Sequence, residues 1–326
     1  MNSLFSTSIR IFKEETRHSL RVFYKLVTMV LPVIILVKIA TELKLINYLA
    51  LPLEPIMSFV GLPKLMGLVL ATGMIAGINS SILLYISLMP ELGPVSVADI
   101  SVFSVMLLIA HGLPVEGRVS SYCGFNFWRH VVLRLSGALS AGFILRQIYT
   151  YTGYAQEPAK LFWNISTQNS FSDNPWILWG ISQAKSFSIM FVVIWLLIVI
   201  MRILKELNLL QLLNGTVSPF LRLLGISKNA SSITVIGMLA GLLYGGGLIM
   251  EEVRKGQVDK KDVFAAMFFM SLTHSIIEDT ALLMLIGADF YGIFVFRILF
   301  SFILTAVFMQ FFSKKNGNNT LATSSS

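Results

Sequence analysis

Residues 271–283 read SLTHSIIEDTALL, a run that places a histidine and two carboxylates inside a segment otherwise apolar enough to lie in lipid. An ionisable side chain at membrane depth costs about 2.5–3.5 kcal/mol on insertion scales unless it faces a partner or a water-filled cavity. Such residues therefore indicate a functional site. A similar run, AHGLPVEG, occupies residues 110–117 far upstream.

The composition is that of a polytopic membrane protein. Of 326 residues, 55% are hydrophobic and only 13% are charged, and the mean hydropathy of +0.76 is too high for a soluble domain. The net charge of +8 comes from basic residues scattered at the ends of apolar runs, without the basic stripe and stacking aromatics typical of nucleic-acid binding. We therefore expect the lipid bilayer, and no nucleic acid, as a partner.

The chain also contains an internal repeat. Shifted by about 164 positions, the sequence pairs charged, glycine and proline residues in one register, such as Lys38 with Arg202, Glu42 with Glu206, Pro55 with Pro219 and Gly61 with Gly225. GMIAG at 73–77 meets GMLAG at 237–241, and after a one-residue slip His111 meets His274, Glu116 meets Asp279 and Arg134 meets Arg297. Agreement at polar positions favours duplication over chance.

Each half carries the same parts in the same order. These are a long apolar helix (22–43 and 178–203), a mixed interfacial segment (44–60 and 207–222), a glycine-broken apolar run (64–87 and 229–250) and two further helices (98–117 with 125–148, and 262–283 with 290–312). A membrane crossing needs about 20 apolar residues. The predicted division is an amphipathic segment at 1–21, repeats at 22–150 and 178–312, an outer-face linker at 151–177 and a disordered tail at 313–326.

Two interpretations of the glycine-broken runs are open. Each run is either one kinked helix packed through small residues or a helical hairpin that enters and leaves on the same side. Lys and Arg are abundant at 1–21, 202–228 and 254–261 and sparse at 44–99, 147–184 and 284–296, and only hairpins put the basic segments on one side. We therefore predict an all-α inverted repeat with about six transmembrane helices and two re-entrant hairpins. Both termini are expected in the cytoplasm of a bacterium, with the chain in the inner membrane.

Polar residues of the two halves are predicted to meet near mid-membrane. His274 and Glu278 are four residues apart and so share one helical face, with Asp279 beside them. Gly112 and Pro114 are expected to interrupt the helix of the first half. With the hairpin tips added, the predicted substrate-binding or ion-binding set is Asn79, Ser80, Ser81, His111, Glu116, Gly245, Gly246, His274, Glu278 and Asp279.

Enzyme motifs are missing from the sequence. HExxH, GxSxG and GxxxxGK[ST] do not occur, so we expect neither catalysis nor a cofactor. If a metal binds, His274 and Glu278 have the spacing of two ligands on a helix. Arg134 and Arg297 are expected to act as counter-ions or interface anchors, and Asp289 is equally suited to a turn or to binding.

From the glycine run at 237–247 through residues 271–289, the sequence resembles the nucleoside-recognition, or gate, domain family. Its relatives include the spore maturation proteins A and B, the membrane part of the B-type ferrous iron transporters and the core of concentrative nucleoside transporters. The resemblance covers nearly the whole chain as two gate units, about 20–150 and 175–312, and implies paired hairpins and broken helices around a central solute site. The chain lacks the GTP-binding domain of the iron transporters and the scaffold helices of the nucleoside carriers.

These features predict a secondary transporter of a small polar solute, for which a nucleoside-like compound is one candidate, coupled to H⁺ or another cation. One alternative is a divalent-metal permease in which the same side chains are ligands. Another is a non-transporting membrane partner protein of the spore-maturation type. Each of these three hypotheses is compatible with a homo-oligomer.

Overall fold

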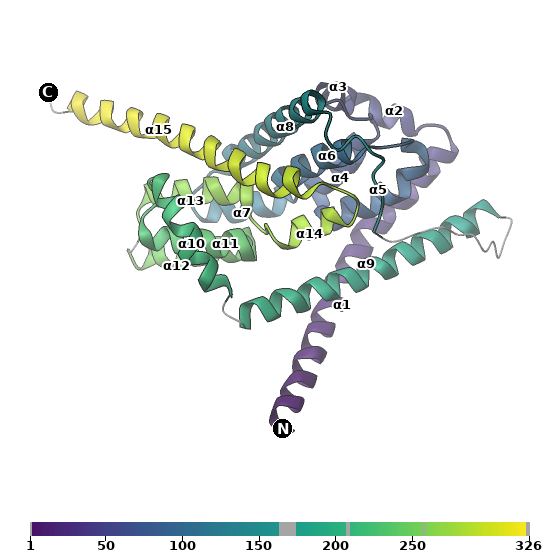
Figure 1. The fold of residues 1–326 in the computed structure, drawn as a ribbon, viewed down its shortest axis with the longest axis horizontal. Helices are drawn as coiled ribbons and strands as arrows, with labels where there is room; N and C mark the ends of the chain where they lie inside the picture. The colour runs from purple at the N-terminus through teal and green to yellow at the C-terminus, as the bar shows by residue number, and fades with distance from the viewer. Residues whose placement is uncertain (1, 163–173, 207–208, 257, 324–326) are drawn as a thin grey trace.

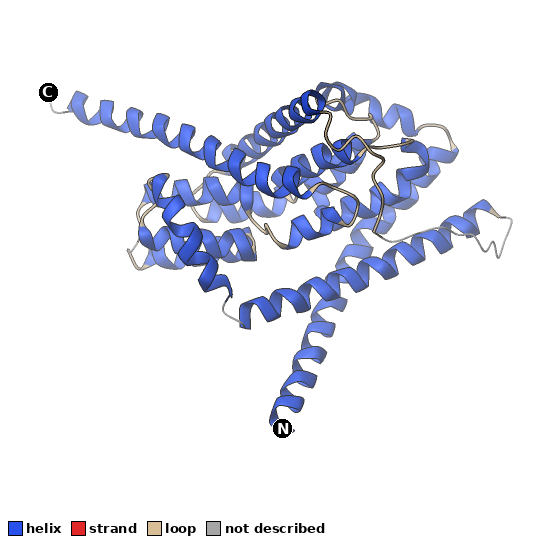
Figure 2. Cartoon of the chain, in the orientation of Figure 1, coloured by secondary structure: helices blue, strands red, loops and turns tan. Residues whose placement is uncertain are grey.

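The computed structural model describes residues 2–162, 174–206, 209–256 and 258–323, so the predicted linker at 151–177 lies partly outside these ranges. The described chain consists of helices joined by loops, with no strand (Figure 2). In order, the helices are α1 (Asn2–Glu42), α2 (Ile46–Ala50), η1 (Leu51–Leu53), α3 (Glu54–Phe59), α4 (Met66–Ala76), α5 (Ile78–Leu92), α6 (Val97–Ala110), α7 (Leu113–Tyr122), α8 (Phe127–Thr152), α9 (Pro175–Glu206), α10 (Leu209–Leu223), α11 (Lys228–Ala240), α12 (Leu242–Arg254), α13 (Lys260–Thr273), α14 (Glu278–Met284), η2 (Tyr291–Phe296) and α15 (Arg297–Thr323).

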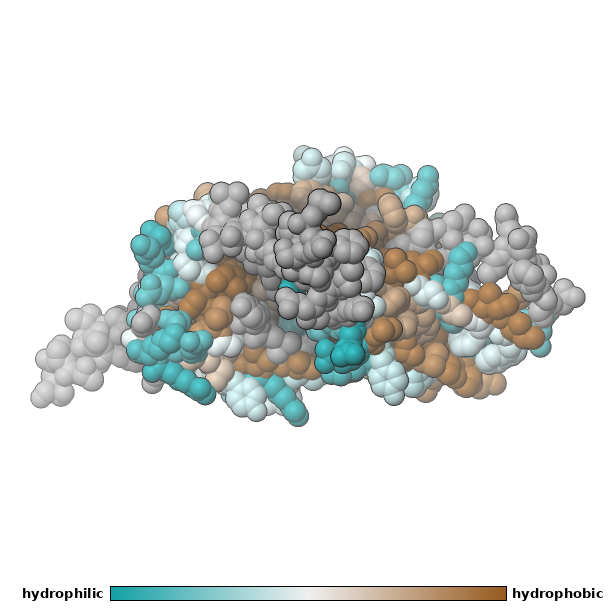
Figure 3. Space-filling view, turned by 90° about the horizontal axis from the view of Figure 1, so that it is seen from below, coloured by the Kyte–Doolittle hydropathy of each residue, from teal (hydrophilic) through white to brown (hydrophobic). Residues whose placement is uncertain are grey.

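The chain is an all-α polytopic membrane protein, as the composition predicts. Five segments of the described chain are long and apolar enough to cross a membrane: Thr16–Glu42, Val97–Tyr122, Phe127–Thr152, Pro175–Ile200 and Tyr291–Gln310. Apolar side chains on them face outward, as at Leu36, Leu299 and Ile303, each more than half exposed. Hydrophobic side chains, coloured brown, cover much of one face of the molecule (Figure 3). Soluble proteins rarely carry so much exposed apolar surface, whereas lipid accommodates it.

The sixth predicted crossing, 262–283, is divided in two, as is its counterpart 98–117, where α6 ends at Ala110 and α7 begins at Leu113. α13 ends at Thr273 and α14 begins at Glu278, and their 14 and 7 residues rise only about 21 and 10 Å. Neither spans a hydrocarbon core of about 30 Å. The backbone leaves the helical conformation at His274, where ψ is 159°, and at Ser275, where φ is +50°.

Both terminal segments are helical where the structure describes them. The amphipathic segment expected at 1–21 and the crossing expected at 22–43 form one continuous helix, α1, because no glycine separates them. At the other end, α15 runs on to Thr323, so the tail predicted to be disordered at 313–326 is helical as far as it is described. No proline interrupts residues 297–323, and this helix projects from the bundle (Figure 1).

The two glycine-broken runs are helical hairpins rather than kinked helices. The Ser81 hydroxyl of α5 donates a 2.8 Å hydrogen bond to the Val69 carbonyl of α4. In one straight helix these residues would lie about 18 Å apart. The turns occur at Gly77 (φ +89°) and Gly241 (φ +98°), in a backbone conformation that favours glycine because it has no Cβ. The same residue type therefore reverses the chain at matched places in the two halves.

The two predicted interfacial segments differ in structure, since the second holds the 15-residue helix α10 (Leu209–Leu223). Residues 44–60 form the short α2, η1 and α3. In the second half, α10 meets α11 at a bend, where the helical pieces 214–223 and 228–240 make an angle of 120°. These short or bent pieces lead the chain from each long first helix into its hairpin.

The centre of the bundle is built around α6. Of its apolar window, 78% is buried, against 22–33% for the other four candidate spans. Every face of α6 is apolar, so it packs on all sides, against α4 and α8 of the first half and α13, α14 and η2 of the second. α1 and α9 cross at the edge of this assembly (Figure 1). The two broken helices thus meet at the core.

Candidate functional site

A histidine stands at the end of each central helix. α6 ends before His111, whose ψ is 159°, and Gly112 follows in the left-handed conformation at φ +60°. This break between His111 and Glu116 is the one expected from Gly112 and Pro114. In the second half, His274 and Ser275 adopt the same pair of conformations. The expectation that His274 and Glu278 share one helical face is therefore wrong, since Ser275 ends the helix between them.

The two imidazole rings face each other across the repeat. His111 Nδ1 lies 3.1 Å from the Leu107 carbonyl oxygen, and His274 Nδ1 lies 2.9 Å from that of Met270. A carbonyl only accepts hydrogen bonds, so each Nδ1 carries a proton, and a ring in its neutral form presents a bare lone pair at Nε2. The two Nε2 atoms are 3.2 Å apart. Both rings are buried, with exposed fractions of 8% and 1%.

Glu116 contacts both rings. Its Oε1 lies 3.3 Å from His111 Nε2, and its Oε2 lies 3.1 Å from His274 Nε2. Asp279, its partner in the repeat, approaches from the other half with Oδ2 at 3.6 Å from His111 Nε2. This Oδ2 atom is buried and accepts no hydrogen bond from any residue that the structure describes. The four side chains, His111, Glu116, His274 and Asp279, are called the central cluster below.

Two fully buried arginines enclose the central cluster. Arg134 of α8 forms an ion pair with Glu116 and donates from Nε to the Ile109 carbonyl. Arg297 donates from Nε to the Leu272 carbonyl at 2.7 Å, and from Nη2 to the carbonyls of Leu108 and His274 at 3.1 Å each. These carbonyls belong to helix ends, which lack intrahelical donors. The counter-ion role expected for Arg134 matches this geometry, and Arg297 caps broken helices.

The breaks at the ends of α6 and α13 are held by similar contacts in the two halves. The bonds from Arg134 to Ile109 and from Arg297 to Leu272 each join residues 25 apart. Beyond each break, a backbone N–H reaches the first arm of the neighbouring hairpin, from Gly112 to the Gly73 carbonyl and from Ile276 to that of Met238, at 3.0 Å in both cases. The arginine contacts thus recur at matched residues, and the backbone bonds recur one residue further along the chain in the second half, while the predicted repeat boundaries stay a prediction.

His130 joins the site although the sequence did not point to it. It is fully buried on α8, with Nε2 3.4 Å from Arg134 Nη1 and Nδ1 3.0 Å from the Ser271 hydroxyl. Its place one helical turn before Arg134 is the only sequence signal that indicates it. The repeat gave no help, because the matching position is Ile293.

In the part of the chain that the structure describes, no hydrogen bond joins the residues predicted at the first hairpin tip to the central cluster. Asn79, Ser80 and Ser81 open α5 just after Gly77, and the two serines bond carbonyls of their own hairpin, Ala76 and Val69. The Asn79 Oδ1 atom is buried without a hydrogen-bond partner among the described residues.

The second tip is Gly241, so the placement of Gly245 and Gly246 at a tip is wrong. Both lie inside α12, where a Cβ on Gly245 would stand 2.5 Å from Gly237 Cα. The Gly246 carbonyl accepts a hydrogen bond from Cys123 Sγ at 3.3 Å. Because glycine has no side chain, neighbouring helices can pack closely at these two positions.

The candidate metal ligands also differ from those predicted. Glu278 is half-buried at the start of α14, and the group of donors within 4.8 Å of one another is His111, Glu116 and His274. Glu116 therefore stands where Glu278 was expected. Asp289 has the capping role of a turn residue, since its Oδ2 accepts from the Gly292 N–H at 2.8 Å.

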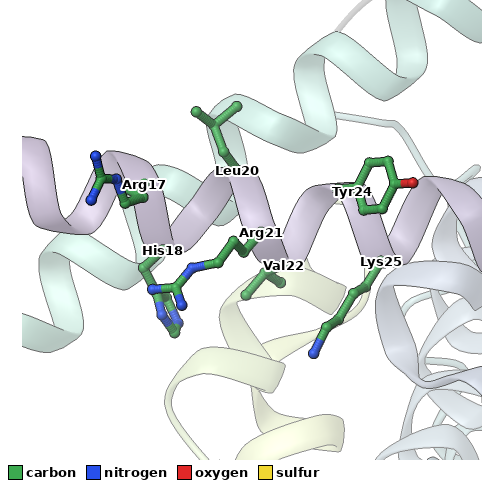
Figure 4. A pocket seen from close by; sticks show the side chains of 7 residues that line it. All are labelled: Arg17, His18, Leu20, Arg21, Val22, Tyr24 and Lys25. Atoms are coloured by element: carbon green, nitrogen blue, oxygen red, sulfur yellow. The ribbon is translucent and has the colours of Figure 1, made fainter.

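Three surface cavities lie away from the central cluster. One, of about 480 Å³, runs along α1, where His18, Arg21 and Lys25 point to one side (Figure 4). A second, of about 460 Å³, lies between α8, α13 and α15, and a third, of about 660 Å³, between α1 and α9. No residue of the central cluster lines these three cavities, and His111, His274 and Asp279 are buried.

Comparison with known proteins supports the resemblance in sequence. Residues 187–290 match the model of the Gate family, described as nucleoside recognition. The chain is also similar to a protein of Bacillus subtilis (strain 168) described as the uncharacterized membrane protein YvoD, with 24% identity over 280 residues, which covers 85% of this chain and 86% of that protein. No solved structure gives a significant match. The matched range includes the second hairpin, His274, Glu278 and Asp279.

Proposed function

We propose that this protein is a permease of a bacterial inner membrane that moves a small polar solute by alternating access, with the central cluster binding the coupling cation. The observation that carries the proposal is a buried group of two histidines and two carboxylates where the broken helices of both halves meet. Ionisable groups at such depth are expensive and mark ion or substrate pathways. Broken helices meeting between matched halves form the central sites of many secondary transporters.

The contacts suggest how binding and movement are linked. Glu116 belongs to the first half and reaches His274 of the second, and Asp279 reaches back to His111. A cation held by these side chains would attract both halves to one point and favour the enclosed state. Its release would remove that attraction and allow one half to move against the other. A ligand shifts such an equilibrium only through its different affinity for the two states.

The family description makes nucleosides the first solutes to test, without fixing the substrate. No catalysis and no resident cofactor are part of the proposal. Both termini are placed in the cytoplasm because basic residues gather in the segments that the hairpin topology puts there.

Uptake by the purified full-length protein in liposomes tests the proposal. A thermal-stability screen against nucleosides and amino acids selects the solutes, since a ligand of the folded state raises the Tm. We expect uptake of a selected solute to depend on an imposed ion gradient and to be lost in Glu116→Gln and His274→Ala. His18→Ala, which changes a histidine on α1 away from the central cluster, should transport normally.

Two results would contradict the proposal. One is uptake at the unmodified rate in Glu116→Gln and His274→Ala when both fold normally. The other is no flux of any screened solute together with co-purification of a fixed partner, which would favour the partner-protein hypothesis.

A further inference from the structure

Three side chains of the central cluster, His111, His274 and Glu116, place donor atoms at the mutual distances of ligands on one metal ion. A tetrahedral ion with ligand bonds of about 2.0–2.1 Å holds its donors about 3.4 Å from one another. Here the separations are 3.2 Å between the two Nε2 atoms, and 3.3 Å and 3.1 Å from these to the nearest Glu116 oxygens. The donors therefore need little movement to bind an ion placed among them.

The protonation of the rings fits the same arrangement. Because Nδ1 of each histidine donates to a helix carbonyl, Nε2 is the nitrogen that is left bare when the ring is neutral. A metal-bound histidine commonly donates its second N–H to a backbone carbonyl, which fixes the ring and raises its basicity. Two lone pairs facing each other at 3.2 Å repel unless a cation lies between them. The backbone carbonyls of α6 and α13 thus orient both rings so that their Nε2 atoms can bind a cation.

From this geometry we propose that His111, His274 and Glu116 bind a divalent ion of the first transition series, with Asp279 as the fourth donor. Imidazole nitrogen selects such ions over Mg²⁺ and Ca²⁺, which prefer oxygen ligands. The unpartnered Asp279 Oδ2, 3.6 Å from His111 Nε2, is the nearest further ligand. The ion's role as the coupling or transported cation rests on the proposed function, whereas its binding does not.

Charge balance predicts reversible binding. When both are ionised, Glu116 and Asp279 carry two negative charges, which the buried guanidiniums of Arg134 and Arg297 balance without a metal. A divalent ion therefore adds two charges that no further carboxylate of the central cluster neutralises. Burying uncompensated charge is unfavourable, so affinity should be lower than at a structural zinc site. A cation that must leave again on the other side of a membrane needs such a site.

Metal titration of the purified full-length protein, after treatment with a chelator, tests the site without any flux measurement. We expect one Zn²⁺ per chain, a rise in Tm with Zn²⁺ but not with Mg²⁺, and intense visible absorption from Co²⁺ in a tetrahedral environment. His111→Ala and His274→Ala should each weaken Zn²⁺ binding by at least about 100-fold, since loss of a supporting group alone costs about 10–100-fold. His18→Ala should bind as the unmodified protein does.

Several results would overturn the inference. They are absence of stoichiometric Zn²⁺ and Co²⁺ binding to the unmodified protein, equal stabilisation by Mg²⁺, or unchanged binding in both histidine variants. If an alanine variant does not fold, His111→Gln and His274→Gln keep a polar side chain there, and the Co²⁺ spectrum of the unmodified protein needs no variant. Zn²⁺ binding without solute flux would leave the metal site standing and reject the transporter. Ion-coupled solute flux without metal binding would support the transporter and reject the metal site. It would point to a proton shared by the two rings as the coupling ion.

Discussion

The Nε2 atom of His111 lies 3.2 Å from that of His274, so two residues 163 positions apart in the chain nearly touch at the centre of the bundle. This contact joins the end of α6 to the end of α13, which belong to different halves. Each ring is held from behind by a carbonyl of its own helix. The contact is therefore fixed by two backbones rather than by flexible side chains.

Removing Arg134 should strongly destabilise the protein. Arg134→Met leaves the buried Glu116 without its ion-pair partner, and breaking a buried pair in this way costs about 3–5 kcal/mol. Thermal unfolding of the purified protein measures the loss. Arg134→Met combined with Glu116→Met should recover much of it, because no unpaired charge remains. A double variant as unstable as the single one would contradict the ion-pair explanation.

The hairpin turns should not tolerate a side chain. Gly77→Ala places a Cβ at φ +89°, which costs about 1–3 kcal/mol even though the space around it is open. Gly241→Ala should cost more, since its Cβ would also stand 3.1 Å from the Ser275 hydroxyl. Gly180→Ala is the matched control in α9, where space is also open and alanine favours a helix. A fall in Tm for Gly180→Ala as large as for Gly77→Ala would count against the strained turn.

Close packing within the second hairpin should make two neighbouring glycines behave differently. A Cβ on Gly245 would meet the Gly237 backbone at 2.5 Å, whereas one on Gly247 of the same helix would meet nothing within 4 Å. Gly245→Ala should therefore cost about 1–3 kcal/mol through overpacking. Gly247→Ala should be neutral or slightly stabilising. Tm values of the two variants, compared in one detergent, measure this, and equal shifts would contradict the packing shown here.

Asp289 should contribute to stability by linking the two halves near η2. Its carboxylate accepts from the Tyr149 and Tyr154 hydroxyls at 3.1 and 3.2 Å and also caps Gly292, so Asp289→Ala should cost about 1–2 kcal/mol. The exposed Glu91→Ala is the control. Unfolding in denaturant measures both variants, and a cost for Asp289→Ala no larger than the control would show that these bonds add nothing.

The repeat and the placement of charge in apolar helices could predict the architecture and the centre of the site. The expense of charge in lipid points to His111, Glu116, His274 and Asp279, and glycine indicates a turn in each broken run, although the second turn lies at Gly241 rather than at the predicted 245–247. Local pattern could not reveal Ser275, because serine in the left-handed conformation carries no signature comparable to that of Gly112. That one residue breaks α13, separates His274 from Glu278 and gives Glu116 the position beside both rings.

Other differences arise from tertiary contacts. His130 reaches Arg134 and Ser271 only through the packing of α8 on α13, which no spacing along the chain encodes. The glycines at 245–247 suggested a tip, but the single glycine at 241 sufficed for the turn. The others were then available for close approach to Gly237 and Cys123.

The matched halves hold their carboxylates unequally. Glu116 has an arginine partner and reaches two rings, while Asp279 keeps one oxygen unbonded among the described residues and lies farther away. Under the proposed alternating access, the opposite-facing state would exchange these roles, with Asp279 paired to Arg297 and Glu116 released. The double variant Glu116→Asp with Asp279→Glu exchanges the two carboxylates, and we expect it to shift the balance between the two states.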